Sequence, residues 1–160
     1  DAAKLTWVNA HYIKQADDAR LAGLVAAQLA GRGLAVAADD RLVAMCALFK
    51  DRCSTTVDLA DWLQMYFAPV TPTAEDLSAH LTDAVRPALV SLRDRLAACP
   101  WDKAGIAQAL KDTLAEHKLK MPLLAMPLRA LLCGRTQTPS VDAVVALFDR
   151  SMALARLQHV

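Results

Sequence analysis

The sequence has little net charge, few aromatic side chains and little glycine. The first shortage argues against a generally basic surface, and the other two argue against a fold built from sheets. The formal net charge is +1 over 160 residues, so no general excess of Lys and Arg is available for a polyanionic partner, and any such surface must be local. Aromatic residues make up 5% and glycine only five positions, whereas 55% of the chain is apolar, largely Ala and Leu. This composition favours packed helices over sheets.

Long apolar runs and paired cysteine motifs are also missing. No apolar stretch approaches the ~20 residues of a membrane-spanning helix, and no signal peptide is present. We therefore expect a cytoplasmic protein without a membrane partner. The four cysteines have neither C-x-x-C spacing nor a nearby histidine, which indicates small buried apolar residues in a reducing compartment. They are Cys46, Cys53, Cys99 and Cys133.

Motifs for catalysis are absent as well. The sequence contains no Gly-rich phosphate loop, no G-x-S-x-G and no H-E-x-x-H. The four histidines are far apart, and His80 and His117 fall at helical positions where a surface or capping role is the usual one. We therefore expect no catalytic residue, no metal site and no cofactor in this chain.

The pattern that is present is helical throughout. No run of alternating apolar and polar residues persists, and apolar residues recur at helical spacing instead. A Pro- and Thr-rich stretch at residues 69–73 has the composition of a linker. The sequence predicts an all-α fold, a helical bundle of about eight to nine helices in two packed subdomains, residues 1–70 and 71–160.

Residues that cap helices stand at several expected helix starts. Asp17 or Asp18 precedes the second helix and Asp39 the third. Thr55 and Thr73 are each followed three residues later by an aspartate, a pattern similar to a capping box. These residues predict where four of the helices begin.

Apolar spacing defines the faces of two of the expected helices. In the first helix Leu5, Val8 and Tyr12 share one side. A long helix after Thr73 is expected to bend at Pro87, because proline lacks the amide hydrogen of the helical ladder. Its apolar face comprises Leu81, Val85, Leu89, Leu92 and Leu96.

The most informative segment extends from residue 126 to residue 145. Pro127 and Pro139 each precede a run of helix-forming residues, and Gly134 closes the first run. Thr138 is a good N-cap residue. The segment therefore predicts two short helices joined by a polar turn, and a pair of helices that only packs into a core has the same pattern. Its core face comprises Leu128, Leu131, Leu132, Val144 and Val145.

The same segment lies in the longest acid-free stretch of the chain. No Asp or Glu occurs from His117 to Val141. A local excess of cations is typical of a surface that contacts phosphates, although an ordinary solvated surface has it too. The cations in this stretch are Lys118, Lys120, Arg129 and Arg135.

Other residues have competing interpretations. Trp7, Trp62 and Trp101 are of the type that stacks on unstacked bases, but their apolar neighbours favour a role as core anchors. Lys50 and Arg52 flank the end of the third helix, where cations complement the helix dipole. Arg52 stays a candidate because arginine forms forked hydrogen bonds with bases.

Three segments, in this order, resemble segments of bacterial glutamyl-tRNA synthetases. Residues 4–14, KLTWVNAHYIK, resemble the family's K-L-x-W-x-N-x-x-Y-I. Residues 48–59, LFKDRCSTTVDL, are similar to L-x-x-x-R-x-x-T-x-x-x-L, and residues 125–144, AMPLRALLCGRTQTPSVDAV, to M/Q-P-L-R-x-x-x-x-G-x-x-x-[ST]-P. The resemblance implies the C-terminal, helical anticodon-binding region of such an enzyme.

Residue roles follow from the resemblance. It implies that Arg129 contacts an anticodon base and that Arg52 helps to read the last anticodon base, which separates glutamate from glutamine tRNAs. The S/T-P turn of the family approaches the splayed anticodon bases, and its counterparts here are Thr138, Pro139, Ser140 and Val141. Lys118, Lys120 and Arg135 are expected to contact the RNA backbone.

Three parts of the sequence depart from the pattern of the family. Ser140 stands where glycine is common, which limits how closely the backbone approaches a base. Pro122, in KMPLLA, stands near where the family more often has a glycine after its methionine. Phe148-Asp149 replaces a common Leu-Gly pair.

The resemblance also describes a larger protein. The whole class I enzyme activates glutamate with ATP and Mg²⁺ on its catalytic half, and its partner is glutamate tRNA rather than DNA. The H-I-G-H and K-M-S-K-S motifs of that half are absent here, and residues 120–122, KMP, are not the second of them. The chain begins at Asp1 rather than methionine, so we expect a piece of a longer protein. We also expect the whole enzyme to be a monomer.

Two alternatives remain open at this point. A helical protein-interaction module would use apolar grooves and bind no RNA, and its binding would be nearly independent of salt. A non-discriminating synthetase would keep the fold and also charge glutamine tRNA.

Overall fold

A computed structural model describes residues 2–160, apart from the side chains of residues 6–8. The predicted roles of Val8 and Trp7 therefore lie outside the described side chains. Residues 2–160 form ten α-helices and two short 3-10 helices, without a strand. This confirms the all-α prediction, with slightly more helices than the predicted eight to nine. The chain divides into two compact units, Asp1–Pro69 and Val70–Val160.

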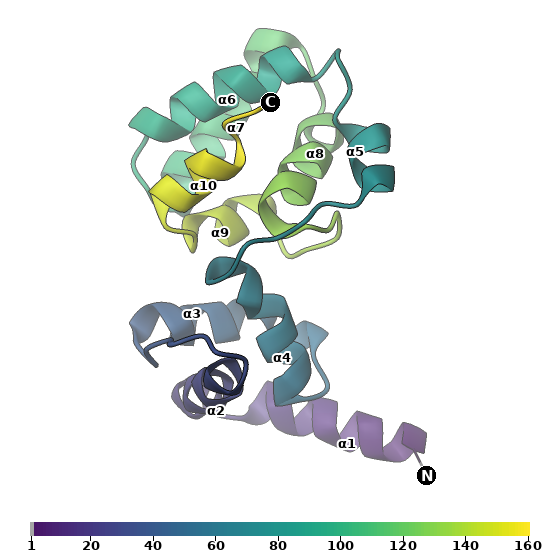
Figure 1. The fold of residues 1–160 in the computed structure, drawn as a ribbon, viewed down its shortest axis with the longest axis vertical. Coiled ribbons are helices and arrows are strands. Elements are labelled where there is room, and N and C mark those ends of the chain that lie inside the picture. Colours follow the sequence, from purple (N-terminus) through teal and green to yellow (C-terminus); the bar gives the residue numbers. More distant parts are fainter. Residues whose placement is uncertain (1) are drawn as a thin grey trace. The chain divides into compact units, whose positions relative to one another are not determined.

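Three helices of the first unit pack against one another (Figure 1). Helix α2 contacts both α3 and α4, and α1 contacts the first 3-10 helix, η1. Its elements are α1 (Ala2–Gln15), α2 (Asp18–Gly31), α3 (Asp40–Phe49), η1 (Lys50–Arg52), α4 (Thr56–Leu63) and η2 (Gln64–Tyr66). The fully buried residues include Leu21, Val25, Leu29, Leu42, Met45, Phe49, Leu59 and Leu63.

The predicted caps of this unit are confirmed. Asp17 accepts a hydrogen bond from the amide of Ala19, and Asp39 from that of Leu42. Thr55 Oγ1 accepts from the Asp58 amide at 3.0 Å. Each side chain satisfies an amide that the first helical turn leaves without a partner.

The predicted apolar face of the first helix is wrong for two of its residues. Leu5 is 61% exposed and Tyr12 is 49% exposed, whereas Ile13 is buried. Helix α1 contacts η1, so the buried side of the helix is the one that carries Ile13.

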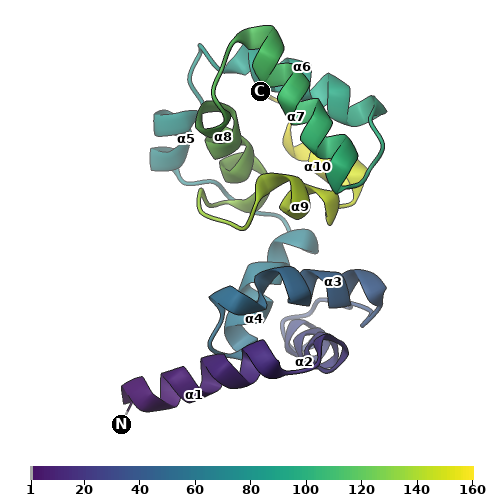
Figure 2. The same cartoon turned by 180° about the vertical axis from the view of Figure 1, so that it is seen from behind.

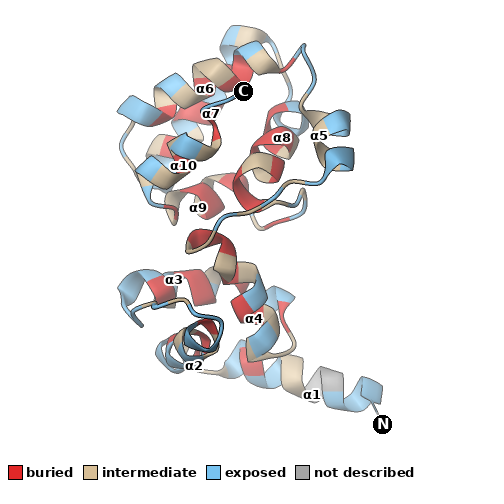
Figure 3. Cartoon of the chain, viewed as in Figure 1, coloured by how far each residue is buried: buried red, intermediate tan, exposed pale blue. Residues whose placement is uncertain are grey.

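The second unit contains six helices, and Figure 2 shows them from behind. Helix α6 lies beside α7, α7 beside α9, and α5 beside α8. They are α5 (Ala74–His80), α6 (Arg86–Ala98), α7 (Lys103–His117), α8 (Met121–Cys133), α9 (Val141–Ala146) and α10 (Arg150–Arg156). Figure 3 shows buried residues on the inner sides of these helices, and they include Leu89, Leu92, Leu96, Ile106, Leu124, Leu128, Leu132, Val144, Val145 and Phe148.

The single bent helix expected after Thr73 is wrong. Thr73 does cap a helix, since its Oγ1 accepts from the Asp76 amide at 3.0 Å, but that helix ends at His80. A new helix begins at Arg86, with Pro87 in its first turn. Proline needs no amide partner there and its fixed φ suits a helix start, so Pro87 begins α6 instead of bending a longer helix.

The cysteines and the helix lengths agree with the composition. None of the four cysteines forms a disulfide, and Cys46, Cys53 and Cys133 are buried, as expected for small apolar residues. Within residues 2–160, none of the helices combines the length and apolar character needed to cross a bilayer.

Gly105 allows a close backbone contact at the start of α7. The carboxylate of Asp102 caps this helix by accepting from the Gly105 amide at 2.7 Å. A Cβ atom on residue 105 would lie 2.1 Å from the carbonyl oxygen of Pro100. The turn between α6 and α7 therefore fits only a residue without a side chain.

Gly105→Ala is expected to lower the free energy of unfolding of the second unit by about 1–3 kcal/mol, because backbone must move to relieve the clash. Urea denaturation measures the change. Gly23→Ala in α2 is the matched control, since its Cβ meets nothing within 4 Å; it should raise the stability of the first unit by about 1 kcal/mol. Equal stability of Gly105→Ala and the parent chain would contradict the steric argument.

Candidate functional site

The predicted hairpin is formed by α8 and α9, but α8 begins earlier than expected. It starts at Met121, with Pro122 in its first turn, and Pro127 lies inside the helix rather than at its first position. An internal proline removes one ladder hydrogen bond. The helix continues through it because Leu124 and Leu128, on either side of Pro127, are fully buried.

Gly134 ends α8 as predicted. It adopts the left-handed conformation with φ 71°, and its amide donates to the Ala130 carbonyl. A Cβ at this position would also lie 3.3 Å from Cβ of Val70. Both the positive φ and the close approach explain a glycine here.

Thr138 does not cap α9, so that prediction is wrong. Helix α9 begins at Val141, with Ser140 as the residue before it. The Thr138 hydroxyl accepts a hydrogen bond from Arg129 Nε at 2.9 Å and donates to the Pro139 carbonyl at 2.8 Å. Because the hydroxyl is occupied in this way, and the side chain is buried, it is not available to the amides of α9.

Arg129 connects the two halves of the hairpin. Its side chain is half-buried, and besides the Thr138 hydrogen bond its Nη2 lies 3.4 Å from the Pro139 carbonyl oxygen. Nη1 has no acceptor among the described residues. The structure thus brings Arg129, Thr138 and Pro139 together and leaves one donor group of the guanidinium available.

Ser140 and Val141 lie next to this group. The Ser140 hydroxyl is exposed and donates to Oδ1 of Asp142 at 2.8 Å. Val141 is buried, with 7% of its surface exposed, so it forms part of a wall. Asp142 was not among the residues predicted from the sequence; the one signal was that it ends the acid-free stretch.

A cavity of about 420 Å³ opens beside Arg129. This volume lies within the range of roughly 300–1,000 Å³ that is typical of small-ligand sites. Its lining is mostly apolar, with three polar exceptions, Arg129, Ser140 and Asp142. The remaining residues are Ala107 and Leu110 of α7, Met121, Pro122, Ala125 and Met126 of α8, and Val141 of α9.

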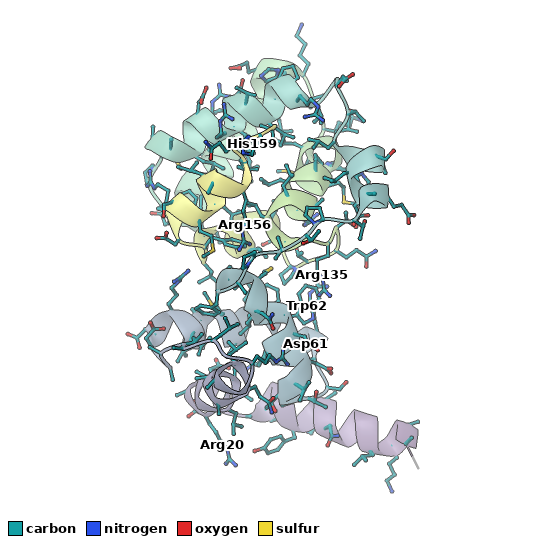
Figure 4. All side chains as sticks on the ribbon, in the orientation of Figure 1. Arg20, Asp61, Trp62, Arg135, Arg156 and His159 are labelled. Carbon is teal, nitrogen blue, oxygen red and sulfur yellow. The ribbon has the colours of Figure 1, made fainter. Side chains whose placement is uncertain are left out.

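The predicted phosphate-contacting cations do not form one cluster. Lys118 and Lys120 are exposed before the start of α8, and Lys118 has a positive φ of 53° at the end of α7. Arg135 is exposed in the turn after Gly134 (Figure 4). Since α8 has 13 residues, the two groups are separated by about 20 Å of helix.

Arg52 belongs to the first unit. It is exposed at the end of η1, and its guanidinium carbon lies 6.0 Å from the centroid of the Trp62 ring, which Figure 4 labels on α4. Trp62 is half-buried against Phe49, with ring centroids 5.3 Å apart. Lys50 pairs with Asp18 at 2.8 Å, so this lysine connects the start of η1 to α2.

Trp101 has a structural role in the second unit. Its indole Nε1 donates to the Phe148 carbonyl at 2.8 Å, and Arg150 covers its ring at 5.0 Å from the centroid. The half-buried Trp62 and Trp101 therefore both contact the interior of their units, as the interpretation as core anchors expects.

His117 takes part in a contact between α6 and α7. Its Nε2 lies 2.8 Å from Ser91 Oγ and 2.9 Å from Glu116 Oε1. Serine and carboxylate thus meet the same imidazole nitrogen, whereas a catalytic triad needs them on opposite nitrogens. Hydrogen bonds from Ser91 and then Arg95 lower the pKa of Glu116. No group of three His, Cys, Asp or Glu within the described part of the chain has a metal-binding arrangement.

Comparison with known proteins identifies the family. Residues 18–160 match the family model described as the anticodon binding domain. The chain belongs to the anticodon-binding-domain family.

Two similar proteins are glutamate–tRNA ligases. The one from Leptothrix cholodnii is 62% identical over 161 residues, which cover 100% of this chain and 34% of that protein. The one from Paracidovorax citrulli is 54% identical over 160 residues, covering 99% of this chain and 34% of that protein. The anticodon-binding domain described here therefore spans about a third of the length of these relatives.

A solved structure shows the same fold. The crystal structure of a glutamate tRNA ligase from Elizabethkingia meningosepticum in complex with its amino acid superposes with a TM-score of 0.90. It is 18% identical and covers 99% of this chain and 32% of that one. At this identity the similarity establishes the fold of the domain.

Arg156 fastens the end of α8 in this anticodon-binding domain. Its Nη1 donates to the Leu132 carbonyl at 2.6 Å, and its guanidinium carbon lies 5.1 Å from the Phe148 ring centroid. Burial lowers the pKa of Arg156. Burial also raises the pKa of the Cys133 thiol to about 12, although Arg156 and Arg129 act in the opposite direction.

Thr138→Val is expected to destabilise the domain by about 1–2 kcal/mol, because it keeps the shape of the side chain but removes the acceptor for Arg129 Nε. Chemical denaturation measures the loss. Thr138→Ser retains the hydroxyl and should recover most of the stability. If Thr138→Val and Thr138→Ser change the free energy of unfolding equally, the hydrogen bond does not stabilise the hairpin.

The stability of the domain should fall as pH rises above 9. The unfolded Cys133 thiol ionises near its ordinary pKa of about 8.5, while the folded thiol stays protonated up to about 12. The unfolded state then binds fewer protons, so the free energy of unfolding decreases by about 1.4 kcal/mol per pH unit for this thiol. Denaturation between pH 9 and pH 12 should give a shallower slope for Cys133→Ala; an identical slope would contradict this linkage.

Proposed function

We propose that this domain binds the anticodon loop of glutamate tRNA as part of a glutamate–tRNA ligase. The proposal rests mainly on the group formed by Arg129, Thr138 and Pro139, which holds a guanidinium beside a largely apolar cavity with Nη1 unoccupied. RNA-binding proteins commonly recognise unstacked loop bases through side-chain hydrogen bonds within such apolar surroundings. The family match and the named relatives support the same conclusion.

The remaining predicted residues have separate roles in this proposal. Ser140 and Val141 border the site of the base. Ser140 contributes a hydroxyl there, and Val141 contributes an apolar side chain. Lys118, Lys120 and Arg135 attract the phosphates of the loop. In functional terms residues 71–160 carry the contacts with the anticodon hairpin, and residues 1–70 contribute Arg52, which bears on the choice between glutamate and glutamine tRNAs.

The proposal extends to the ligase as a whole. ATP, Mg²⁺ and glutamate would bind to its catalytic part, and this domain would select the tRNA that is charged there. We further propose that the ligase is a cytoplasmic monomer whose nucleic-acid partner is tRNA rather than DNA.

Arg129→Ala should lower the affinity of the chain for a glutamate tRNA anticodon stem–loop by about tenfold, because it removes a base contact and releases Thr138 and Pro139. Fluorescence anisotropy at two salt concentrations measures the effect. Arg129→Lys keeps the charge but lacks Nε and should give an intermediate affinity. Arg86→Ala removes a half-exposed cation at the start of α6, paired at 3.5 Å with Asp83, and should bind nearly normally.

Two results would overturn this function. One is an affinity for glutamate tRNA, and a preference over glutamine tRNA, that Arg129→Ala leaves unchanged. The other is binding that does not weaken as salt increases, since phosphate contacts release counterions and depend on salt. Salt-independent binding to a protein partner would instead favour the helical interaction module.

A further inference from the structure

The exposed guanidinium of Arg52 lies over a single side chain of the first unit. Its carbon is 6.0 Å from the centroid of the Trp62 ring, a distance at which a cation is still attracted to the face of an aromatic ring. Among the hydrogen bonds, ion pairs and ring contacts of the described residues, this is the one contact of the guanidinium. Arg52 is therefore held by the indole, while its N–H groups have no acceptor within the described part of the chain.

The carboxylates of the neighbouring helix are engaged with other partners. Asp61 of α4 pairs with Arg32 at 2.8 Å. Oδ2 of Asp58, in the first turn of α4, accepts from the Ser54 amide at 3.1 Å. Because neither carboxylate pairs with Arg52, the charge and the donors of this arginine remain available to a group outside the chain.

Trp62 is itself held by a row of aromatic rings. Its ring packs against Phe49, with centroids 5.3 Å apart and the planes at 40°. Phe49 in turn meets Tyr66 edge-on, with centroids 6.1 Å apart and the planes at 78°. Phe49 and Tyr66 are 0% and 1% exposed. Since these two rings belong to the core, the indole that contacts them offers Arg52 a fixed surface.

We propose that Trp62 is a positioning residue that orders Arg52 for its contact with the anticodon loop, a proposal that rests on the proposed function. An exposed arginine loses rotamer freedom when it binds, and a side chain that is ordered beforehand loses less. A guanidinium held over an indole keeps its in-plane N–H groups available, and arginine contacts bases with these groups. Trp62 thus increases the selectivity between glutamate and glutamine tRNAs through Arg52.

Trp62→Leu keeps an apolar side chain beside Phe49 but removes the aromatic face. The preference of the chain for a glutamate over a glutamine tRNA anticodon stem–loop should fall about threefold, because an exposed cation–π contact is modest in strength. Fluorescence anisotropy with labelled stem–loops measures it. Trp62→Phe keeps a smaller ring and should give an intermediate preference. Trp101→Leu is the matched control: it removes a tryptophan of the second unit that has Arg150 over its ring at 5.0 Å, and it should keep the preference.

A double-mutant cycle shows whether the effect passes through Arg52. In an Arg52→Ala background, Trp62→Leu should cause no further loss of preference, because no guanidinium is left to position. A tryptophan that only stabilises the fold would change the free energy of unfolding and leave the preference alone. The proposal is wrong if Trp62→Leu keeps the full preference, or if it lowers the preference by the same factor with and without Arg52.

The outcomes separate this proposal from the proposed function. If Arg129→Ala weakens binding and Arg52→Ala abolishes the preference, but Trp62→Leu keeps it, the positioning role is wrong and the function stands. The same conclusion follows if the unmodified chain binds both stem–loops equally well. If it shows no salt-dependent binding to either stem–loop, both are wrong.

A second measurement needs no RNA and no loss of the tryptophan. Protons over the face of an indole are shifted upfield by its ring current, so the side-chain NMR signals of Arg52 should lie upfield in the unmodified chain. Trp62→Phe should reduce this shift, and Trp101→Leu should retain it. Arg52 signals at their usual positions in the unmodified chain would contradict the contact on which the positioning depends.

Discussion

The hydrogen bond from Arg129 Nε to the Thr138 hydroxyl is the constraint on which the rest of the site depends. It joins the last two turns of α8 to the segment before α9, and Pro139 extends it by placing its carbonyl within reach of both side chains. Hydrogen bonds to a charged donor are worth about 1.5–3 kcal/mol. With Nε engaged, the guanidinium keeps a fixed plane, and Ser140 instead of Thr138 is the residue that precedes α9.

Helix α8 can support this arrangement because the burial of its apolar side chains stabilises it more than the intrinsic helix propensity of its residues does. An internal proline costs a helix ~3 kcal/mol or more, and Pro127 stands in the middle of α8. Leu124, Leu128 and Leu132 are buried along the same helix, and each contributes about 1.5–3 kcal/mol on burial. Burial of these three side chains outweighs the lost ladder hydrogen bond, so the helix remains continuous and presents Arg129 one turn before its end.

The sequence predicts features that are decided by neighbouring residues, such as helix caps. It does not predict features that depend on tertiary packing. The caps at Asp39, Thr55 and Thr73 were predicted because a cap is decided within four residues. Proline was ambiguous, since Pro87 begins a helix and Pro127 lies inside one. The base-contacting candidates of the hairpin came from the family resemblance. Asp142 was not predicted, because its place in the cavity depends on three helices that only the fold brings together.

The distribution of charge along α8 fits recognition of an extended strand better than of a compact anion. Lys118 and Lys120 lie before the helix and Arg135 lies after it, about 20 Å apart by helix length, so they cannot share one phosphate. Under the proposed function they contact different phosphates of the loop, while Arg129 addresses a base. Phosphate contacts then position the loop independently of its sequence, and the few polar groups of the apolar cavity determine the selectivity.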